Sequence, residues 1–433
     1  MEFEKSLEPL SPVVTRQEAI GIAEHFGTPV YVYSQLMLEE QADKALSFPN
    51  AFGLTVRYAM KANPNQNILR IFNKKGIKID ASSSYEALRA IKAGIDPHNI
   101  LLTSKLAPNI PSLTSLINSG VEYNACSLKQ LENYGKVFPN SEVSVRINPG
   151  LGSGHNNRTN TGGESSPFGI WFGYIKDIFD VAQDYSLLVT RIHTHIGSGS
   201  DPEVWKRVAR MSLDNVEKFL RAGHPVKTLN LGGGYKVSRM ADGCDGKTTD
   251  LQECGEPIRN AFVDFAKRTG VELKLEIEPG TYLVANAECV IARVEDIVST
   301  PKYKFIITDS GMNEVTRPSL YGAQHPITVI NLRADSNKTE EYVVCGKCCE
   351  SGDILTPEKG DSEAIATRRL REAKVGDLVV IGGTGAYCSS MSTVGYNSFT
   401  QAPEVLIDND RNFLLIRRRQ TLDQMLENEI NVI

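Results

Sequence analysis

The 433-residue chain lacks the features that mark membrane, secreted and nucleic-acid-binding proteins. No apolar run approaches the roughly 18 residues that a membrane-spanning helix needs. Residues 1–5 (MEFEK) have no apolar core of the kind found in a signal peptide. The net charge is −5, and lysine and arginine are spread along the chain, which argues against a nucleic-acid partner. We therefore expect a soluble cytoplasmic protein that binds neither membrane nor nucleic acid.

Two common ligand-binding motifs are also missing. The chain has no GxxxxGKS or GxxxxGKT segment, which argues against a nucleoside triphosphate. Cys345 and Cys348 have the spacing of half a zinc site, but no second such pair or nearby histidine pair completes it, so we expect no metal. The eight cysteines are widely spaced in a chain without a secretion signal, which predicts reduced thiols.

The first two thirds of the chain alternate between strand-like and helix-like segments, and the 41% hydrophobic composition can bury a large core. The strand-like segments are 54–58, 77–80, 100–103, 120–124, 142–147, 189–195, 226–231 and 272–277. Eight strands that alternate with helices predict an α/β fold of the (β/α)8 barrel type. A doubly wound open sheet is the competing interpretation.

Beyond about residue 290 the helical periodicity nearly disappears. Strand-like segments follow at 289–294, 304–308, 327–332, 341–344, 378–381 and 413–417, with a hairpin turn expected at 408–411. We predict a C-terminal all-β domain that the strand near residues 28–34 completes. The predicted domains are an N-terminal arm and strand at 1–35, a barrel at 36–288 and the β domain at 289–433. The polar segment 150–163 is predicted to be a long loop.

Polar residues stand at the ends of six of the eight predicted barrel strands. They are Lys61, Asp80, Arg146 with Asn148, His195 with Ser198, the triplet Gly232, Gly233 and Gly234, and Glu278. Alone, Lys61 would most simply be a surface lysine. Because the carboxyl ends of barrel strands surround the active site, six polar endings together predict a catalytic site there.

The residue types at these endings suit pyridoxal phosphate. Lys61 could bind the cofactor covalently, and the backbone N–H groups of Gly232–Gly234 could approach its phosphate beside the hydroxyl of Ser198. Glu278 would keep the pyridine nitrogen protonated, because an opposite charge favours the charged form. His195 could stack on the ring. Since His193 and His195 lie two apart on a strand, a metal pair stays an alternative for them.

Five segments identify a family at this point. YAMKAN, HTHIGSGS, NLGGGY, EPG and GAYCSSM resemble, in this order, motifs of the fold-type III pyridoxal-phosphate decarboxylases. The resemblance covers residues 28 to 425. Within that family, residues 317–325, 349–353 and 417–421 are similar to segments of the diaminopimelate decarboxylases.

The resemblance implies an alanine-racemase-like barrel, a cofactor and roles for individual residues. Lys61 would carry pyridoxal phosphate, and Cys349 would be the second catalytic residue, as proton donor. Cys349 could also be an inert small residue. The implied cofactor-binding residues are Lys61, Asp80, Arg146, His195, Ser198, Gly232, Gly233, Gly234, Glu278, Gly280, Thr281 and Tyr387. The implied substrate-binding residues are Arg317, Tyr321, Glu350 and Tyr387.

The resemblance also implies a reaction and an assembly. The reaction would convert meso-diaminopimelate to L-lysine, with a small amino acid as the substrate. The assembly would be a homodimer in which the segment with Cys349 and Glu350 completes the neighbouring subunit's site. Alternatives are a related decarboxylase of another amino acid, a racemase and a non-enzymatic pyridoxal-phosphate carrier. Glu278 argues against the racemase, and the long β domain argues against the carrier.

Three positions depart from the family pattern. Thr281 stands where the family usually has arginine after Glu-Pro-Gly, and a short hydroxyl cannot bind a carboxylate as a guanidinium does. Pro167 replaces the usual lysine before Phe168, so an ion pair at the dimer contact is in doubt. Lys347 and Cys348 replace the usual residues before Cys349. These departures bear on the substrate and the assembly, and not on the cofactor.

Overall fold

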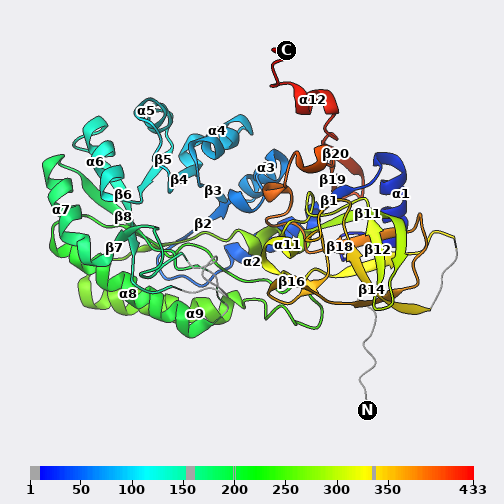
Figure 1. Ribbon diagram of the computed structural model, residues 1–433. Helices are drawn as coiled ribbons and strands as arrows, with labels where there is room; N and C mark the ends of the chain where they lie inside the picture. The colour runs from blue at the N-terminus through cyan, green and yellow to red at the C-terminus, as the bar shows by residue number, and fades with distance from the viewer. Residues whose placement is uncertain (1–9, 153–160, 198, 200, 334–337) are drawn as a thin grey trace. The chain divides into compact units, whose positions relative to one another are not determined.

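The computed structural model describes residues 10–152, 161–197, 199, 201–333 and 338–433 (Figure 1). The chain forms two compact units. Within the described residues, the barrel unit comprises 39–236 and 248–283. The β unit comprises 10–38, 237–247 and 284–433. The segment 237–247 belongs to the β unit, although the residues before and after it in the chain belong to the barrel unit.

The barrel unit holds a closed ring of eight parallel strands in the described part of the chain. The strands are β2 (Leu54–Ala59), β3 (Lys78–Ala81), β4 (Ile100–Thr103), β5 (Glu122–Ala125), β6 (Glu142–Asn148), β8 (Leu188–His193), β9 (Thr228–Asn230) and β10 (Lys274–Ile277). β10 pairs with β2, and β5 pairs with β6, which closes the ring. The predicted (β/α)8 barrel is therefore confirmed, and the open sheet is excluded. A two-residue strand that the sequence did not predict, β7 (Ile170–Trp171), pairs with β6.

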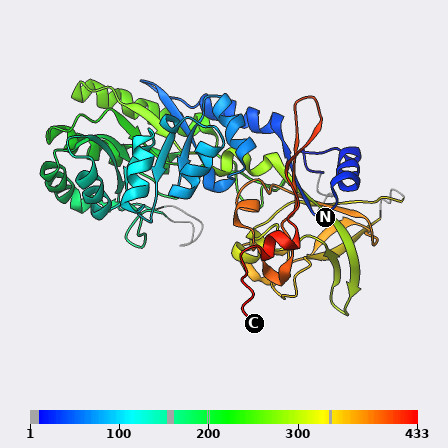
Figure 2. The same ribbon diagram turned by 90° about the horizontal axis from the view of Figure 1, so that it is seen from above.

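Helices follow most of the barrel strands and lie outside them (Figures 1 and 2). They are α2 (Gln35–Leu46), α3 (Gln66–Lys74), α4 (Ser84–Lys92), α5 (Ile110–Asn118), α6 (Leu128–Val137), α7 (Ile175–Asp184), α8 (Pro202–Arg221) and α9 (Leu251–Thr269), with α10 (Thr281–Val284) after β10. Side-chain caps begin several of them. Ser83 accepts a hydrogen bond from the backbone of Glu86, and Ser127 accepts one from Gln130. These caps begin each helix a few residues after its strand.

A charged cluster lies inside the barrel. The Nη2 atom of Arg57 is 2.9 Å from Glu122 Oε2 and 3.2 Å from Glu276 Oε1. Arg191 Nε lies 3.1 Å from the other oxygen of Glu276. Burial alone would lower the pKa of Arg57, but the two carboxylates raise it. The buried charges are therefore balanced by one another.

The β unit is built on a nine-stranded sheet in which the N-terminal strand is an interior member. The strands are β1 (Val30–Ser34), β11 (Glu288–Ser299), β12 (Lys304–Thr308), β13 (Ile327–Ile330), β14 (Thr339–Cys345), β17 (Arg368–Arg371), β18 (Leu378–Gly382), β19 (Glu404–Ile407) and β20 (Phe413–Arg417). β1 pairs antiparallel with β11 and parallel with β19. The predicted completion of the β domain by the N-terminal strand is confirmed.

The other elements of the β unit are short. They are β15 (Pro357–Glu358), β16 (Asp361–Ile365), α1 (Arg16–Phe26), α11 (Arg317–Tyr321) and α12 (Leu422–Leu426). β19 and β20 form an antiparallel hairpin, and the turn predicted at 408–411 lies between them. No helix in the described residues is long and apolar enough to span a membrane.

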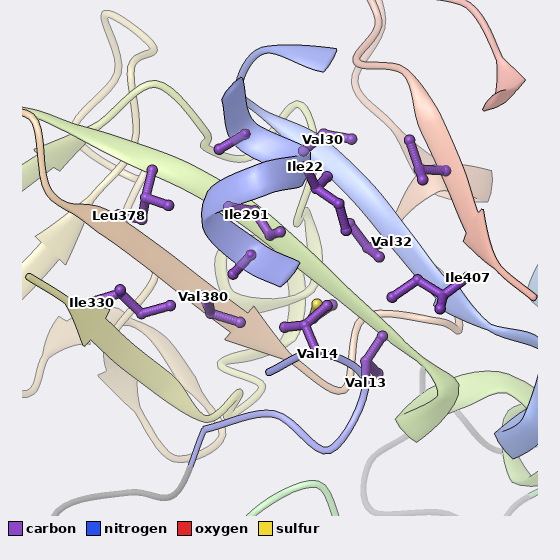
Figure 3. Close-up of a cluster of buried hydrophobic side chains, with 14 residues drawn as sticks. Val13, Val14, Ile22, Val30, Val32, Ile291, Ile330, Leu378, Val380 and Ile407 are labelled. Carbon is purple, nitrogen blue, oxygen red and sulfur yellow. The ribbon is translucent and has the colours of Figure 1, made fainter. Parts of the chain in front are cut away.

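The core of this unit lies between α1 and the sheet. Figure 3 shows Ile22 of α1 beside Val30 and Val32 of β1, Ile291 of β11 and Val380 of β18. All five are almost completely buried. Burial of one such aliphatic side chain contributes about 1.5–3 kcal/mol. The strand that the chain makes first is thus fixed by core packing as well as by hydrogen bonds.

Candidate active site

Lys61 lies directly after the first barrel strand. β2 ends at Ala59, and the single 3-10 turn Met60–Ala62 carries the lysine. The hydroxyl of Tyr58 donates a 2.9 Å hydrogen bond to the carbonyl of Asn63, which fixes the turn from both sides. The Lys61 side chain is exposed while Met60 and Ala62 are buried. The turn therefore presents the amine at the carboxyl end of the barrel, where it can react.

Glu278 is held by residues at the ends of two neighbouring strands. Its Oε2 atom is 2.9 Å from His193 Nε2, and its Oε1 atom accepts a 2.7 Å hydrogen bond from Asn230 Nδ2. Burial would raise the pKa of Glu278, but His193 and the hydrogen bond from Asn230 outweigh it and lower the pKa to about 2. Glu278 is thus a buried carboxylate that stays ionised at neutral pH.

Asp80 shares this environment, and its pKa is shifted in the opposite direction. Burial and the negative charge of Glu278 raise the pKa of Asp80 well above its ordinary value, although Lys61 lowers it in part. Its buried Oδ1 atom has no hydrogen-bond partner among the described residues. This oxygen is therefore left as a polar atom for a ligand.

His195 has a neutral ring with a fixed tautomer. Desolvation, Arg146 and Lys61 together lower the pKa of His195 well below its ordinary value. The backbone N–H of Gly233 donates to His195 Nδ1 at 3.2 Å, so the ring proton sits on Nε2. An uncharged flat ring can stack on an aromatic ligand without adding charge to the site.

The glycine triplet after β9 allows two backbones to approach closely. A Cβ atom on Gly233 would lie 2.0 Å from the carbonyl oxygen of Glu278, a separation that real side chains do not adopt. Gly232 accepts a hydrogen bond from Glu278 N through its carbonyl, and its own N–H donates to Asn230 Oδ1. Only glycine at position 233 allows β9 and β10 to end side by side in this way.

Arg146 completes the group of predicted residues in the barrel unit. Its Nη2 atom donates to the carbonyl oxygens of Thr161 at 3.3 Å and His195 at 3.5 Å, and its guanidinium lies over the Phe168 ring. Its buried Nε atom has no partner among the described residues. Gly280 and Thr281 follow Glu278, with Thr281 at the start of α10. Ser198, also predicted here, lies outside the described residues.

The β unit brings together three of the other predicted residues. Arg317 and Tyr321 stand at the two ends of α11, and the phenol groups of Tyr321 and Tyr387 are close enough to affect the pKa of Arg317. Tyr387 has a left-handed backbone with φ of 61°, which is unusual for a residue other than glycine. Such strain is often found where a side chain must be aimed at a ligand.

Cys349 and Glu350 have partners elsewhere in the same unit. The backbone N–H of Cys349 donates to Asn397 Oδ1 at 2.8 Å, and the Tyr396 hydroxyl donates to Glu350 Oε2 at 3.1 Å. Both residues are exposed. Their hydrogen bonds thus tie them to residues 396–397 and not to Arg317 or Tyr321.

His193 and Asn230 contact Glu278, and the sequence did not predict this role for either residue. The sequence left His193 as one of a metal pair, and its Nε2 atom instead contacts Glu278. Among the described residues, no group of three or more His, Cys, Asp or Glu could hold a metal ion. Asn230 was not predicted at all. Its place at the end of β9, two residues before Gly232, was the available signal.

The donor set of the barrel unit fits pyridoxal phosphate. The exposed amine of Lys61 can bind the aldehyde, and the ionised Glu278 can hold a protonated ring nitrogen. The neutral His195 ring can stack on the cofactor ring. The Oδ1 atom of Asp80, which has no partner among the described residues, can form a hydrogen bond with the cofactor. These groups match the aldehyde and the protonated ring of the cofactor.

Comparison with known proteins gives a consistent set of relatives. Residues 38–285 match the family model described as pyridoxal-dependent decarboxylase, pyridoxal binding domain. A diaminopimelate decarboxylase of Escherichia coli K12 is 35% identical over 96% of this chain and 97% of its own length. A solved diaminopimelate decarboxylase structure covers 99% of this chain and 98% of its own, with 34% identity and a TM-score of 0.88. The Helicobacter pylori diaminopimelate decarboxylase in complex with L-lysine covers 95% of this chain and 98% of its own, with 26% identity and a TM-score of 0.83.

Proposed function

The chain belongs to the pyridoxal-dependent decarboxylase family, and we propose that it removes the carboxylate from the D-configured end of meso-2,6-diaminopimelate. The products are L-lysine and carbon dioxide. The observation that carries the proposal is the ionised Glu278 beside Lys61, Asp80 and His195 at the carboxyl end of a closed barrel. The full-length likeness to diaminopimelate decarboxylases supports the choice of substrate.

Each barrel residue has a task in this reaction. Lys61 would attach the cofactor, Glu278 would keep its ring nitrogen protonated, and His195 would cover its ring. Asp80, Arg146, Ser198, Gly232 to Gly234, Gly280 and Thr281 would hold its remaining groups, together with Tyr387 of the β unit. When bound, pyridoxal phosphate would supply the electron-withdrawing group that the loss of carbon dioxide from the substrate α-carbon requires. The Sγ–H of Cys349 would donate a proton to that carbon.

The far end of the substrate is an amino-acid group with its own carboxylate and amine. Arg317, Tyr321 and Tyr387 bind that carboxylate, and Glu350 binds the amine. A guanidinium suits the carboxylate because its N–H groups can form two parallel hydrogen bonds. The grouping of Arg317 with both tyrosines supports this assignment.

The active protein is a homodimer in this proposal, and each subunit lends Cys349 and Glu350 to its neighbour's site. The exposure of both side chains supports this, since a second chain can reach them. A cytoplasmic location and the domain limits 1–35, 36–288 and 289–433 belong to the same proposal.

A related decarboxylase of another amino acid is the second candidate. The observation that favours it is Thr281, which stands where the family usually has an arginine for the substrate. Turnover of lysine or ornithine with none of meso-diaminopimelate would favour this candidate over the first.

One experiment with two variants tests the cofactor and the shared site. Lys61→Ala should lose the visible absorbance of the covalently bound cofactor and all production of L-lysine. Cys349→Ala should keep the absorbance and lose activity. Mixing the two inactive variants should restore about a quarter of the activity, because half of the dimers would be mixed and each would have one intact site. Absorbance that survives in Lys61→Ala would refute the cofactor site, and mixtures without activity would refute the shared site.

A further inference from the structure

Two arginines of the β unit are anchored at the same end of β18. Arg317 begins α11, and Arg239 belongs to the segment 237–247. The positive charge of Arg317 reaches Arg239 and contributes to lowering its pKa. Like charges repel each other, so the anchoring of two arginines at one strand end needs a reason.

The end of β18 positions both groups. Arg239 Nε donates a 2.8 Å hydrogen bond to the carbonyl oxygen of Gly383. Arg317 Nη1 donates to His325 Nε2 at 3.0 Å, and His325 Nδ1 donates in turn to the carbonyl oxygen of Gly382 at 3.0 Å. Two successive backbone carbonyls therefore aim the two guanidiniums.

The fit around Arg239 depends on a missing side chain. Gly383 has φ of 67°, and a Cβ atom there would lie 2.8 Å from Arg239 Cγ and 3.0 Å from Arg239 Cβ and Cδ. The stem of Arg239 occupies the space that any other residue at 383 would fill. Its Nη2 atom is buried and has no hydrogen-bond partner among the described residues. One arm of the guanidinium is therefore available to a ligand.

No carboxylate of the described residues forms an ion pair with either guanidinium. Asp245 is the acid that acts on both, but its oxygens already accept hydrogen bonds from Ser238 Oγ at 2.7 Å and from the backbone N–H groups of Arg239 at 2.8 Å and Met240 at 3.3 Å. Desolvation and the two arginines lower the pKa of His325 well below its ordinary value, so its ring is neutral. The cluster thus carries an excess of positive charge that an anion would balance.

We propose that Arg239 is a substrate-binding residue that binds the distal carboxylate together with Arg317. The inference rests on the proposed function and adds a specificity residue to it. Two guanidiniums can bind both oxygens of one carboxylate. They would repel a substrate whose far end is only an ammonium group, so Arg239 selects diaminopimelate over simple diamino acids.

The kinetic test compares two arginine variants of the β unit. Arg239→Gln removes the charge from the cluster. Arg293→Gln is the matched control, because Arg293 also donates to a glycine carbonyl, that of Gly376 at 3.2 Å, outside the cluster. Loss of one charge-assisted contact should raise KM for meso-diaminopimelate about 10- to 100-fold in Arg239→Gln with a smaller change in kcat. Arg293→Gln should leave both constants near the wild-type values.

The binding test uses two ligands that differ only in the distal carboxylate. L-lysine retains it and cadaverine lacks it, and both can be titrated calorimetrically into the holoenzyme. In Arg239→Gln, Kd for L-lysine should rise about 10- to 100-fold, while Kd for cadaverine should stay constant or fall. An equal rise for both ligands would mean that Arg239 is only structural, and no rise for L-lysine would equally overturn the inference.

The wild-type protein separates this inference from the proposed function. If wild type turns over meso-diaminopimelate and Arg239→Gln behaves identically, only the role of Arg239 is refuted. If wild type neither turns over meso-diaminopimelate nor prefers L-lysine to cadaverine, the proposed function fails first, and the role of Arg239 fails with it.

Discussion

Substitution of Glu278 by glutamine should remove a specific, pH-dependent part of the stability of the barrel. The folded protein holds the pKa of Glu278 at about 2, against an ordinary value of 4.5. A difference of about 2.5 pH units corresponds to about 3 kcal/mol, since one unit is about 1.4 kcal/mol. Because the pKa is lowered on folding, this contribution is complete above pH 4.5 and is lost as the pH falls toward 2.

The assay is urea unfolding followed by tryptophan fluorescence, in protein freed of its cofactor with hydroxylamine. The chain has two tryptophans, Trp171 and Trp205, and both belong to the barrel unit, so the signal reports the unfolding of that unit. At pH 7, Glu278→Gln should unfold with about 3 kcal/mol less free energy than wild type. The difference should shrink steadily as the pH falls below 4.5.

An exposed acid of the same unit provides the control. Asp264 lies on α9 with its carboxylate 78% exposed, and Asp264→Asn should change the free energy of unfolding by less than about 0.5 kcal/mol at any of these pH values. Two results would refute the reasoning. One is a Glu278→Gln variant as stable as wild type at pH 7, and the other is a difference that does not depend on pH.

Two further substitutions test the packing of the barrel. Gly233→Ala should lower the free energy of unfolding by about 3 kcal/mol and abolish cofactor absorbance, because the new Cβ would clash with the Glu278 carbonyl oxygen. Gly21→Ala in α1 is the control, since a Cβ there would lie 3.8 Å from the nearest atom, Phe413 Cε2. This control should not lower the melting temperature. Equal melting temperatures for the two variants would contradict the predicted clash. Arg57→Met should lower the free energy of unfolding by about 3 kcal/mol, since it leaves the buried carboxylate of Glu276 with Arg191 as its remaining ionic partner. Lys176→Met, which removes an exposed pair with Asp180, should change the free energy of unfolding by less than about 1 kcal/mol. A small loss in Arg57→Met would mean that the barrel cluster is not balanced by this arginine.

The barrel and the place of its catalytic residues could be predicted because they depend on local patterns. Alternation of strands and helices is visible in any window of the chain, and the eight strands begin and end within two or three residues of their predicted limits. In parallel barrels the carboxyl ends of all strands meet, so Lys61, Asp80 and Glu278 could be grouped without coordinates.

The partners of these residues could not be predicted in the same way. Asn230 binds Glu278 from a strand 48 positions away, and nothing in its neighbours marks it for that role. The strands β7, β15, β16, β17 and β19 were missed, and two of them, β7 and β15, are only two residues long. Arg239 depends on Gly383, which is 144 positions distant, and only the folded chain brings the two together.

The position of β1 has a consequence for how the protein is made. Val30 pairs with Ile291, and Tyr31 pairs with Glu404, so this strand leaves the ribosome long before either of its neighbours exists. The nine-stranded sheet can be completed only when the chain is nearly finished, whereas each barrel strand finds a neighbour soon after synthesis, apart from the pair that closes the ring. Long-range strand pairing slows folding. We therefore expect the β unit to be the last part to fold, and a removal of the first 34 residues to leave a sheet with two exposed inner edges.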